Sequence, residues 1–291
     1  MGDPEPFLLS AFGDEVASDL DAQVQALRQQ DIRFLELRSV WGTNVVDLSD
    51  ADLRRVHDGL TAGGIGISAI ASPVGKAPVD SDFDAERRRC RRALEAAHRL
   101  GASLVRVFSY FVPGGAYRRY RAEITRRIAA FAADAERAGV TLVLENESYV
   151  YGDSAERCLD LIQAVGSAAL RFAFDPANFV QVGIRPYAEA WPLLSPYVAH
   201  VHIKDAVAVD RGGFSPYPQR VAEERLMDSV RPPGQGDGEL RPLLRDLIRQ
   251  SYRGFLTVEP HLGRRFPDLD GVGRLRAAVA ALRLLVSEVD G

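Results

Sequence analysis

The sequence has few cysteines and no long apolar run. The two cysteines, Cys90 and Cys158, lie in segments of helical character, so we expect packing residues in a reducing compartment and not a disulfide. No apolar stretch approaches the roughly 20 residues that a transmembrane helix needs, and the N-terminus lacks the charged and apolar regions of a secretion signal. We therefore expect a cytoplasmic protein with no membrane partner.

Lysine is almost absent, and arginine supplies most of the positive charge. Of the 36 basic residues only Lys76 and Lys204 are lysines, and the formal net charge is −4. An ammonium and a guanidinium are not interchangeable, so the two lysine positions are of interest. The mild acidity provides no basic stripe for nucleic acid, so we expect a small-molecule substrate and no nucleic-acid partner.

The length and the apolar content are sufficient for a large core. The chain has 291 residues and is 46% hydrophobic, and barrels of roughly 250 residues commonly form one domain. No repeat motif and no low-complexity linker divides the sequence. We therefore expect a single domain over residues 1–291.

Eight short apolar runs alternate with longer amphipathic stretches. The predicted strands are Phe7–Phe12, Ile32–Arg38, Ile65–Ser72, Leu104–Ser109, Val140–Glu145, Leu170–Asp175, Val198–Lys204 and Phe255–Glu259. The predicted helices are Asp19–Gln30, Asp50–Ala62, Asp82–Leu100, Tyr120–Ala138, Ser154–Val165, Tyr187–Leu194, Leu240–Gln250 and Gly271–Val286. Apolar strands covered by helices are typical of a buried parallel sheet.

The ends of the predicted helices carry suitable capping residues. Asp50 and Asp82 are predicted N-caps, and Gly101, Gly139 and Gly166 follow helices where a left-handed residue ends the last turn. Eight strand–helix units in one uninterrupted series predict an α/β fold, a single (β/α)8 TIM barrel. An open doubly wound sheet is the alternative, because strands are easily miscounted from sequence.

Four consecutive predicted strands end in a polar side chain. Glu145, Asp175 and Glu259 end the fifth, sixth and eighth apolar runs, and His202 lies near the end of the seventh. The carboxyl ends of barrel strands form the catalytic face, and neighbouring strands lie about 4.8 Å apart. These four side chains can therefore converge on one point.

Three carboxylates crowded at an apolar rim repel one another and lose hydration. A divalent cation relieves both costs, so we expect one metal ion held by Glu145, Asp175, His202 and Glu259. Carboxylate oxygens with a single imidazole suit Mn²⁺, Mg²⁺ or Co²⁺, with Zn²⁺ as a further choice. We expect Mn²⁺ first.

Nearly the whole chain resembles the xylose-isomerase-like TIM barrel superfamily, in particular its sugar phosphate isomerase/epimerase group. The most specific motifs are Leu144-Glu145-Asn146-Glu147, Phe174-Asp175-Pro176-Ala177-Asn178-Phe179, His200-Val201-His202-Ile203-Lys204-Asp205, Gly234-Gln235-Gly236-Asp237-Gly238 and Val258-Glu259-Pro260-His261. The family's four metal ligands correspond to the same four residues. In its epimerases the two glutamates are also the acid/base pair, which the resemblance carries over to Glu145 and Glu259.

This resemblance implies a metal-dependent isomerase or epimerase of a sugar, cyclitol or related hydroxy-ketone. A metal chelated by the carbonyl and the adjacent hydroxyl stabilises an enediolate, and a positioned carboxylate moves the proton. The same site supports a lyase, either a dehydratase or a 3-keto-glycoside eliminase, as the alternative. A non-catalytic subunit and an abasic-site endonuclease are weaker alternatives, the latter because the chain lacks a basic patch and a histidine-rich rim.

Five further residues are predicted to bind substrate. Lys204, Lys76 and Trp41 follow or end strands at the predicted catalytic face, and His261 lies two residues after Glu259. The alternatives are that the lysines hold the acids in place, that Trp41 packs under a loop and that His261 is a solvated loop residue. The fifth residue, Asn178, stands where similar ketose 3-epimerases carry a histidine. This departure puts epimerisation of a free ketose in doubt, because an amide can bind a hydroxyl but cannot become cationic.

The connection over residues 205–234 is longer than the group's usual one. Long loops at the catalytic face are commonly lids or partner surfaces, so we expect a lid or a contact in a homo-oligomer or hetero-complex here, with a mobile insertion of no functional importance as the alternative. The glycine-rich stretch Gly234–Gly238 contains an aspartate and precedes Glu239, so we interpret it as a turn into a helix and not as a phosphate loop.

Overall fold

Eight parallel strands form a closed barrel in the computed structural model, which describes residues 7–209 and 219–290. Around the barrel the strands follow the order β1-β12-β9-β8-β7-β6-β5-β2. Their bounds are β1 Leu8–Phe12, β2 Phe34–Leu37, β5 Gly66–Ile70, β6 Leu104–Val107, β7 Thr141–Glu145, β8 Leu170–Phe174, β9 Val198–Ile203 and β12 Phe255–Val258. The (β/α)8 prediction is confirmed, and the open sheet is excluded because β1 pairs with both β2 and β12.

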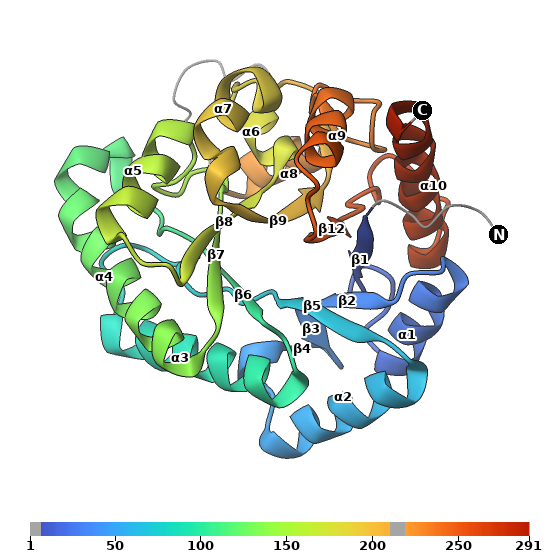
Figure 1. The fold of residues 1–291 in the computed structure, drawn as a ribbon, viewed down its shortest axis with the longest axis horizontal. Coiled ribbons are helices and arrows are strands. Elements are labelled where there is room, and N and C mark those ends of the chain that lie inside the picture. The colour runs from blue at the N-terminus through green and yellow to red at the C-terminus, as the bar shows by residue number, and fades with distance from the viewer. Residues whose placement is uncertain (1–6, 210–218, 291) are drawn as a thin grey trace.

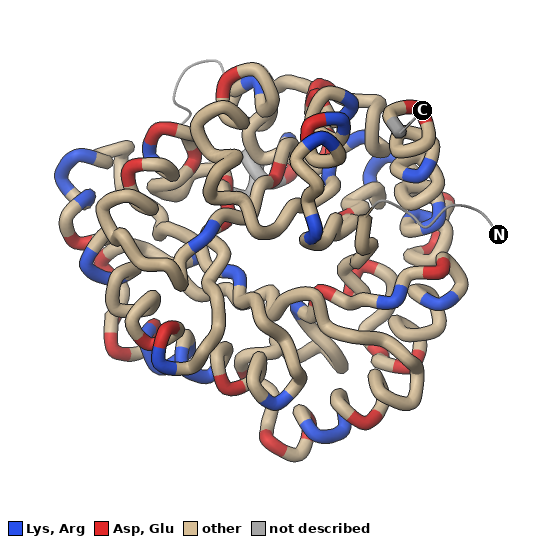
Figure 2. Tube along the Cα trace, in the orientation of Figure 1, with Lys and Arg blue, Asp and Glu red and all other residues tan. Residues whose placement is uncertain are grey.

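Helices surround the strands as an outer ring, in which α10 lies beside β1 and α1 (Figure 1). The helices are α1 Leu20–Gln29, α2 Asp50–Gly63, α3 Phe83–Leu100, α4 Tyr117–Ala138, α5 Ala155–Val165, α6 Pro176–Gln181, α7 Trp191–Leu194, α8 Gln219–Ser229, α9 Leu240–Arg249 and α10 Gly271–Asp290. Acidic and basic residues are interspersed along this ring (Figure 2). Among the described residues, no helix has both the length and the apolar character to cross a membrane.

Most of the predicted helix ends agree with the structure. Asp82 caps α3, and Gly101, Gly139 and Gly166 end their helices in the left-handed conformation. The prediction for Asp50 is wrong, because Ser49 is the N-cap of α2 and forms a capping box with Asp52. Both Ser49 and Asp50 are good capping residues. Ser49 is favoured because the residue three positions later, Asp52, can complete a capping box, whereas the residue three positions after Asp50 is Leu53.

Three connections contain structure that was not predicted. A hairpin of β3 Ser39–Val40 and β4 Thr43–Asn44 follows β2, and the short helix α6 begins directly after β8. The predicted long loop over residues 205–234 contains α8 and a two-stranded sheet of β10 Asp205–Ala206 with β11 Val230–Arg231. Residues 210–218 of this connection lie outside the described part of the chain.

Polar side chains meet inside the barrel below its catalytic end. The Ser10 and Ser68 hydroxyls are 2.7 Å apart, although β1 and β5 are separated by β2. The Glu36 carboxylate of β2 likewise reaches His200 of β9 at 2.6 Å. These contacts between strands that are not neighbours place the side chains in the interior, and this polar layer supports the residues above it.

We predict that neither cysteine reacts with a thiol reagent in the folded protein. Cys90 and Cys158 are free and buried. Burial raises the pKa of Cys90 to about 12 and also raises the pKa of Cys158, so little of the reactive thiolate forms near pH 8. The measurement is titration with Ellman's reagent at pH 8 without reductant, first native and then in guanidinium. Two thiols that react only after unfolding are expected, whereas rapid native reaction or no reaction after unfolding would contradict this assignment.

Candidate metal centre and active site

The four side chains proposed as metal ligands come from four neighbouring strands. Glu145 ends β7, Asp175 follows β8, His202 lies in β9 and Glu259 follows β12, in the barrel order β12-β9-β8-β7. One ligand atom from each lies within 4.8 Å of the others. All four residues are buried, and His202 Nδ1 is 3.1 Å from Glu145 Oε1. The geometry is therefore that of a compact, water-poor cluster at the mouth of the barrel.

Local structure fixes the direction of the Asp175 carboxylate. Asp175 is the N-cap of α6, and its Oδ1 accepts the backbone N–H of Asn178 at 3.0 Å. Pro176 occupies the first turn, where a missing N–H costs nothing. The Asn146 side chain accepts from the backbone N–H of Asp175 and donates to its carbonyl, which ties the ends of β7 and β8 together. The second carboxylate oxygen, Oδ2, is thereby left to face the cluster.

The donor set fits a divalent cation. Glu145 Oε2 and Asp175 Oδ2 are buried and accept no hydrogen bond of good geometry among the described residues; their nearest cations are Arg106 Nε at 3.3 Å and Lys204 Nζ at 2.8 Å. Buried carboxylate oxygens without a hydrogen bond are costly and need a compensating charge. Hard oxygens with one imidazole match the preferences of Mn²⁺, Mg²⁺, Co²⁺ or Zn²⁺.

Lys204 brings a positive charge to the same carboxylates. Its Nζ is 2.8 Å from Asp175 Oδ2 and 2.9 Å from Glu259 Oε2. Burial alone would lower the pKa of Lys204, but Asp175 and Glu259 outweigh it and hold the pKa of this ammonium well above its usual range. Lys204 thus remains charged and neutralises part of the cluster.

Glu259 is surrounded by further positive groups. Arg38 donates to Glu259 Oε1 at 2.9 Å, and His261 Nε2 lies 3.1 Å from the same oxygen. Burial would raise the pKa of Glu259, but Lys204 and His261 outweigh it and hold that pKa well below its usual range. Glu259 is therefore a carboxylate whenever the protein is near neutral pH.

His261 and Arg38 are held by acids that follow β1. His261 Nδ1 is 2.8 Å from Glu15 Oε1, and Arg38 donates to Asp14 at 2.8 Å. Burial would lower the pKa of His261, but Glu15 and Glu259 raise it to about 10. The roles of Asp14 and Glu15 were missed from sequence, although two adjacent acids one glycine after a predicted strand were a usable signal.

Arg106 of β6 is a further residue that was not predicted. Its Nε is 3.3 Å from Glu145 Oε2, and its guanidinium lies over the Phe108 ring at 4.8 Å from the centroid. Its side chain is 7% exposed, so the charge is largely buried beside the cluster. An arginine inside an otherwise apolar strand was the signal that could have identified it.

The remaining predicted substrate residues lie at different distances from the cluster. Asn178 is part of it, because its amide donates to Glu145 Oε1 at 3.3 Å and to the carbonyl of Asn146 at 2.8 Å. Lys76 is exposed and pairs with Glu147 at 2.5 Å. Trp41 is not brought to the cluster: its ring lies beneath Arg55 of α2 and lines a cavity of about 490 Å³ between α1 and α2.

The chain belongs to the xylose isomerase-like TIM barrel family, whose profile matches residues 24–285. No curated protein sequence matches the chain.

Solved structures of low sequence identity share the fold. The IolI protein with a bound zinc atom has a TM-score of 0.74 at 15% identity, covering 97% of this chain and 99% of that one. A D-tagatose 3-epimerase-like protein has a TM-score of 0.68 at 17% identity, covering 97% and 99%. The probable 3-DHS dehydratase AsbF from Bacillus anthracis has a TM-score of 0.71 at 17% identity, covering 94% and 98%.

We predict that Lys204→Met destabilises the metal-free protein and increases its response to metal. Removing the ammonium leaves Asp175 and Glu259 without their buried partner, which typically costs about 3–5 kcal/mol. A divalent ion then no longer competes with the ammonium for Asp175 Oδ2 and Glu259 Oε2, so Mn²⁺ should raise the melting temperature of the variant more than that of the wild type. Differential scanning calorimetry with and without Mn²⁺ measures both effects.

The matched control is Arg121→Met, which removes an exposed ion pair with Asp160. Surface pairs contribute about 0–1 kcal/mol, so this variant should melt near the wild type in both conditions. A Lys204→Met protein as stable as the wild type without metal would contradict the role given to Lys204.

Proposed function

We propose that the chain is a divalent-metal-dependent isomerase or epimerase that moves a proton at a carbon next to the carbonyl of a sugar, cyclitol or related hydroxy-ketone. The observation that carries this proposal is the order of the cluster around the barrel. Glu259 and Glu145 lie on the two outer strands of the four, with His202 and Asp175 between them. Two carboxylates on either side of a central site can serve opposite faces of one substrate.

The ion would be held by Glu145, Asp175, His202 and Glu259. Mn²⁺ is the first choice, with Mg²⁺, Co²⁺ and Zn²⁺ as alternatives, and the zinc atom in the IolI protein supports a divalent cation in this fold. When bound, such an ion acts as a Lewis acid on the carbonyl and hydroxyl oxygens of a substrate.

Within the chain, Glu259 and Glu145 are the pair that would take and return the proton, and Glu259 is present in the ionised form that an acceptor needs. It is held as a carboxylate by Lys204, Arg38 and His261, all within 3.1 Å. Glu145 would return a proton to the opposite face of the substrate. Lys204 and His261 would orient Glu259 and contact substrate oxygens, and Lys76 at the rim would reach a distal part of the substrate.

A lyase is the second candidate, and one observation favours it. Protonated His261 and Lys204 both lie beside Glu259, so a base and two proton donors share one place. Elimination needs this combination, because the leaving group must receive a proton as the base removes another. The structural likeness to AsbF, described as a probable dehydratase, points in the same direction.

We predict metal-dependent exchange of a substrate hydrogen with solvent. The protein loaded with Mn²⁺ is incubated in deuterium oxide with ketoses, an inosose and hydroxypyruvate, and NMR follows deuterium at the carbon next to the carbonyl. Glu259→Gln should lower the exchange rate on any active substrate by about 10²–10⁴-fold, because the proton acceptor is lost. Glu95→Gln is the control: the Glu95 side chain lies on the exposed face of α3, and its loss should leave the exchange rate unchanged. A wild-type protein that takes up no divalent ion would refute the proposed mechanism.

Isomerisation and elimination give different products from the same incubation. An isomerase or epimerase yields an isomer of the substrate that has lost no group and differs in composition only by the exchanged deuterium. A lyase yields an unsaturated carbonyl, which absorbs in the near ultraviolet, together with water or a released alcohol. Growth of this absorbance in step with loss of substrate would replace the first candidate by the second.

A further inference from the structure

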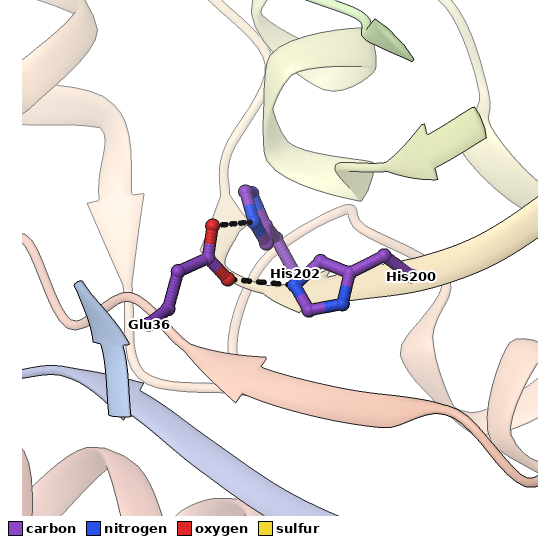
Figure 3. Close-up of side chains that lie close together, drawn as sticks. All are labelled: Glu36, His200 and His202. Atoms are coloured by element: carbon purple, nitrogen blue, oxygen red, sulfur yellow. Dashed lines mark hydrogen bonds and ion pairs between the residues drawn. The ribbon is translucent and has the colours of Figure 1, made fainter. Parts of the chain in front are cut away.

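Behind His202 lies a buried carboxylate that contacts two imidazoles. Glu36 Oε1 is 3.2 Å from His202 Nε2, and Glu36 Oε2 is 2.6 Å from His200 Nε2. All three residues are 0% exposed. Figure 3 shows the Glu36 carboxylate facing both rings from one side, with one oxygen directed at each.

The two nitrogens of His202 therefore face different environments. Nδ1 faces the cluster, 3.1 Å from Glu145 Oε1 and 3.9 Å from Asp175 Oδ2, whereas Nε2 faces Glu36. A neutral imidazole carries one proton, and an ionised carboxylate can only accept. Glu145 at Nδ1 and Glu36 at Nε2 can each accept from the ring, but a cation held on the Nδ1 side would displace the Nδ1 proton, and Glu36 would then keep the remaining proton on Nε2.

The position of Glu36 is itself fixed by its surroundings. His200 Nε2 lies 3.1 Å from the Thr257 hydroxyl as well as beside Glu36. The rings of His200 and His202 meet edge to face with centroids 5.3 Å apart, and Phe12 packs edge-on against His202 at 5.4 Å. The imidazole of His202 thus has little freedom to rotate and exchange its two nitrogens.

We propose that Glu36 is a positioning residue that selects Nδ1 of His202 as its metal-binding nitrogen, with His200 holding Glu36 in place. This inference rests on the metal site of the proposed function. A carboxylate that accepts the second N–H of a ligating histidine fixes its tautomer and raises its basicity, and loss of such a partner typically lowers metal affinity 10–100-fold.

The same three residues could in principle hold a second cation, because their ligand atoms also lie close together. However, each Glu36 oxygen already faces an imidazole nitrogen at hydrogen-bond distance. His202 would also have to bind one ion through each nitrogen. Hydrogen bonding accounts for the contacts without a second ion, so we expect one metal ion per chain.

The test is Glu36→Gln in the full-length protein. Glutamine keeps the shape of the side chain but is neutral and has a single acceptor oxygen, so it holds the Nε2–H of His202 more weakly than the carboxylate does and raises the basicity of the ring less. Competition with a fluorescent chelator measures the affinity for Mn²⁺ and Zn²⁺ alone, without substrate. We expect affinity to fall 10–100-fold in Glu36→Gln and less in Glu36→Asp, which restores an acceptor.

Ser10→Ala is the matched control. It removes a buried hydrogen bond to Ser68 in the same barrel interior, and Ser68 and Ser10 make no described contact with His202. It should therefore bind metal as the wild type does. A loss of affinity in Ser10→Ala equal to that in Glu36→Gln would show a general packing effect and would overturn the inference.

Two further results separate this inference from the proposed function. If His202→Ala loses the metal but Glu36→Gln binds as tightly as wild type, the role of Glu36 is wrong and the metal site stands. If the wild type binds no divalent ion, the proposed function itself fails. Nitrogen-15 NMR of labelled histidines in the Zn²⁺-loaded wild type gives an answer even if Glu36→Gln does not fold, because a proton on Nδ1 of His202, or the absence of one on Nε2, would contradict the proposal. Two ions per wild-type chain would also overturn it.

Discussion

Three buried carboxylates beside one imidazole impose the main constraint on this molecule. Like charges at this spacing repel strongly where water is excluded, and each carboxylate also loses its hydration. The strands cannot move apart to relieve the repulsion, because in a closed barrel every strand is hydrogen-bonded to two neighbours. Positive charge must therefore come to the acids, and several features of the surrounding structure follow from this requirement.

The compensating positive charges come from three different strands or strand ends around the barrel. Lys204 contacts Asp175 and Glu259, Arg38 contacts Glu259 from the end of β2, and Arg106 contacts Glu145 from β6. Each of these cations reaches only one or two of the acids. A divalent ion at the centre of the cluster would reach all of them and the imidazole, so the surrounding cations reduce the repulsion without replacing the ion. This arrangement connects the stability of the barrel mouth to the chemistry that we propose there.

Sequence reasoning located the strands and the polar residues that end them, because both signals are local. Asp175, for example, ends an apolar run and precedes a proline. The contacts of these residues could not be found in the same way: a charged residue inside an apolar strand marks Glu36 and Arg106 as candidates, but no single strand shows which side chains meet across a barrel. Trp41 shows that a position at the catalytic end of a strand does not by itself bring a side chain to the cluster. It follows a strand at the catalytic end, but a left-handed backbone in a short hairpin places its ring against α2.

The long connection after β9 is tied to the cluster at both of its ends. Asp205 directly follows Lys204, and its carboxylate accepts the backbone N–H groups of Gly234, Gly236 and Gly238 within 3.0 Å. A Cβ atom at Gly236 would lie 2.4 Å from Asp205 Oδ1, so this close approach requires glycine. The backbone of the glycine-rich stretch thus binds a carboxylate of the chain itself. Because Asp205 follows Lys204 and lies three residues after His202, these hydrogen bonds fix the backbone directly after the end of β9, next to two residues of the cluster.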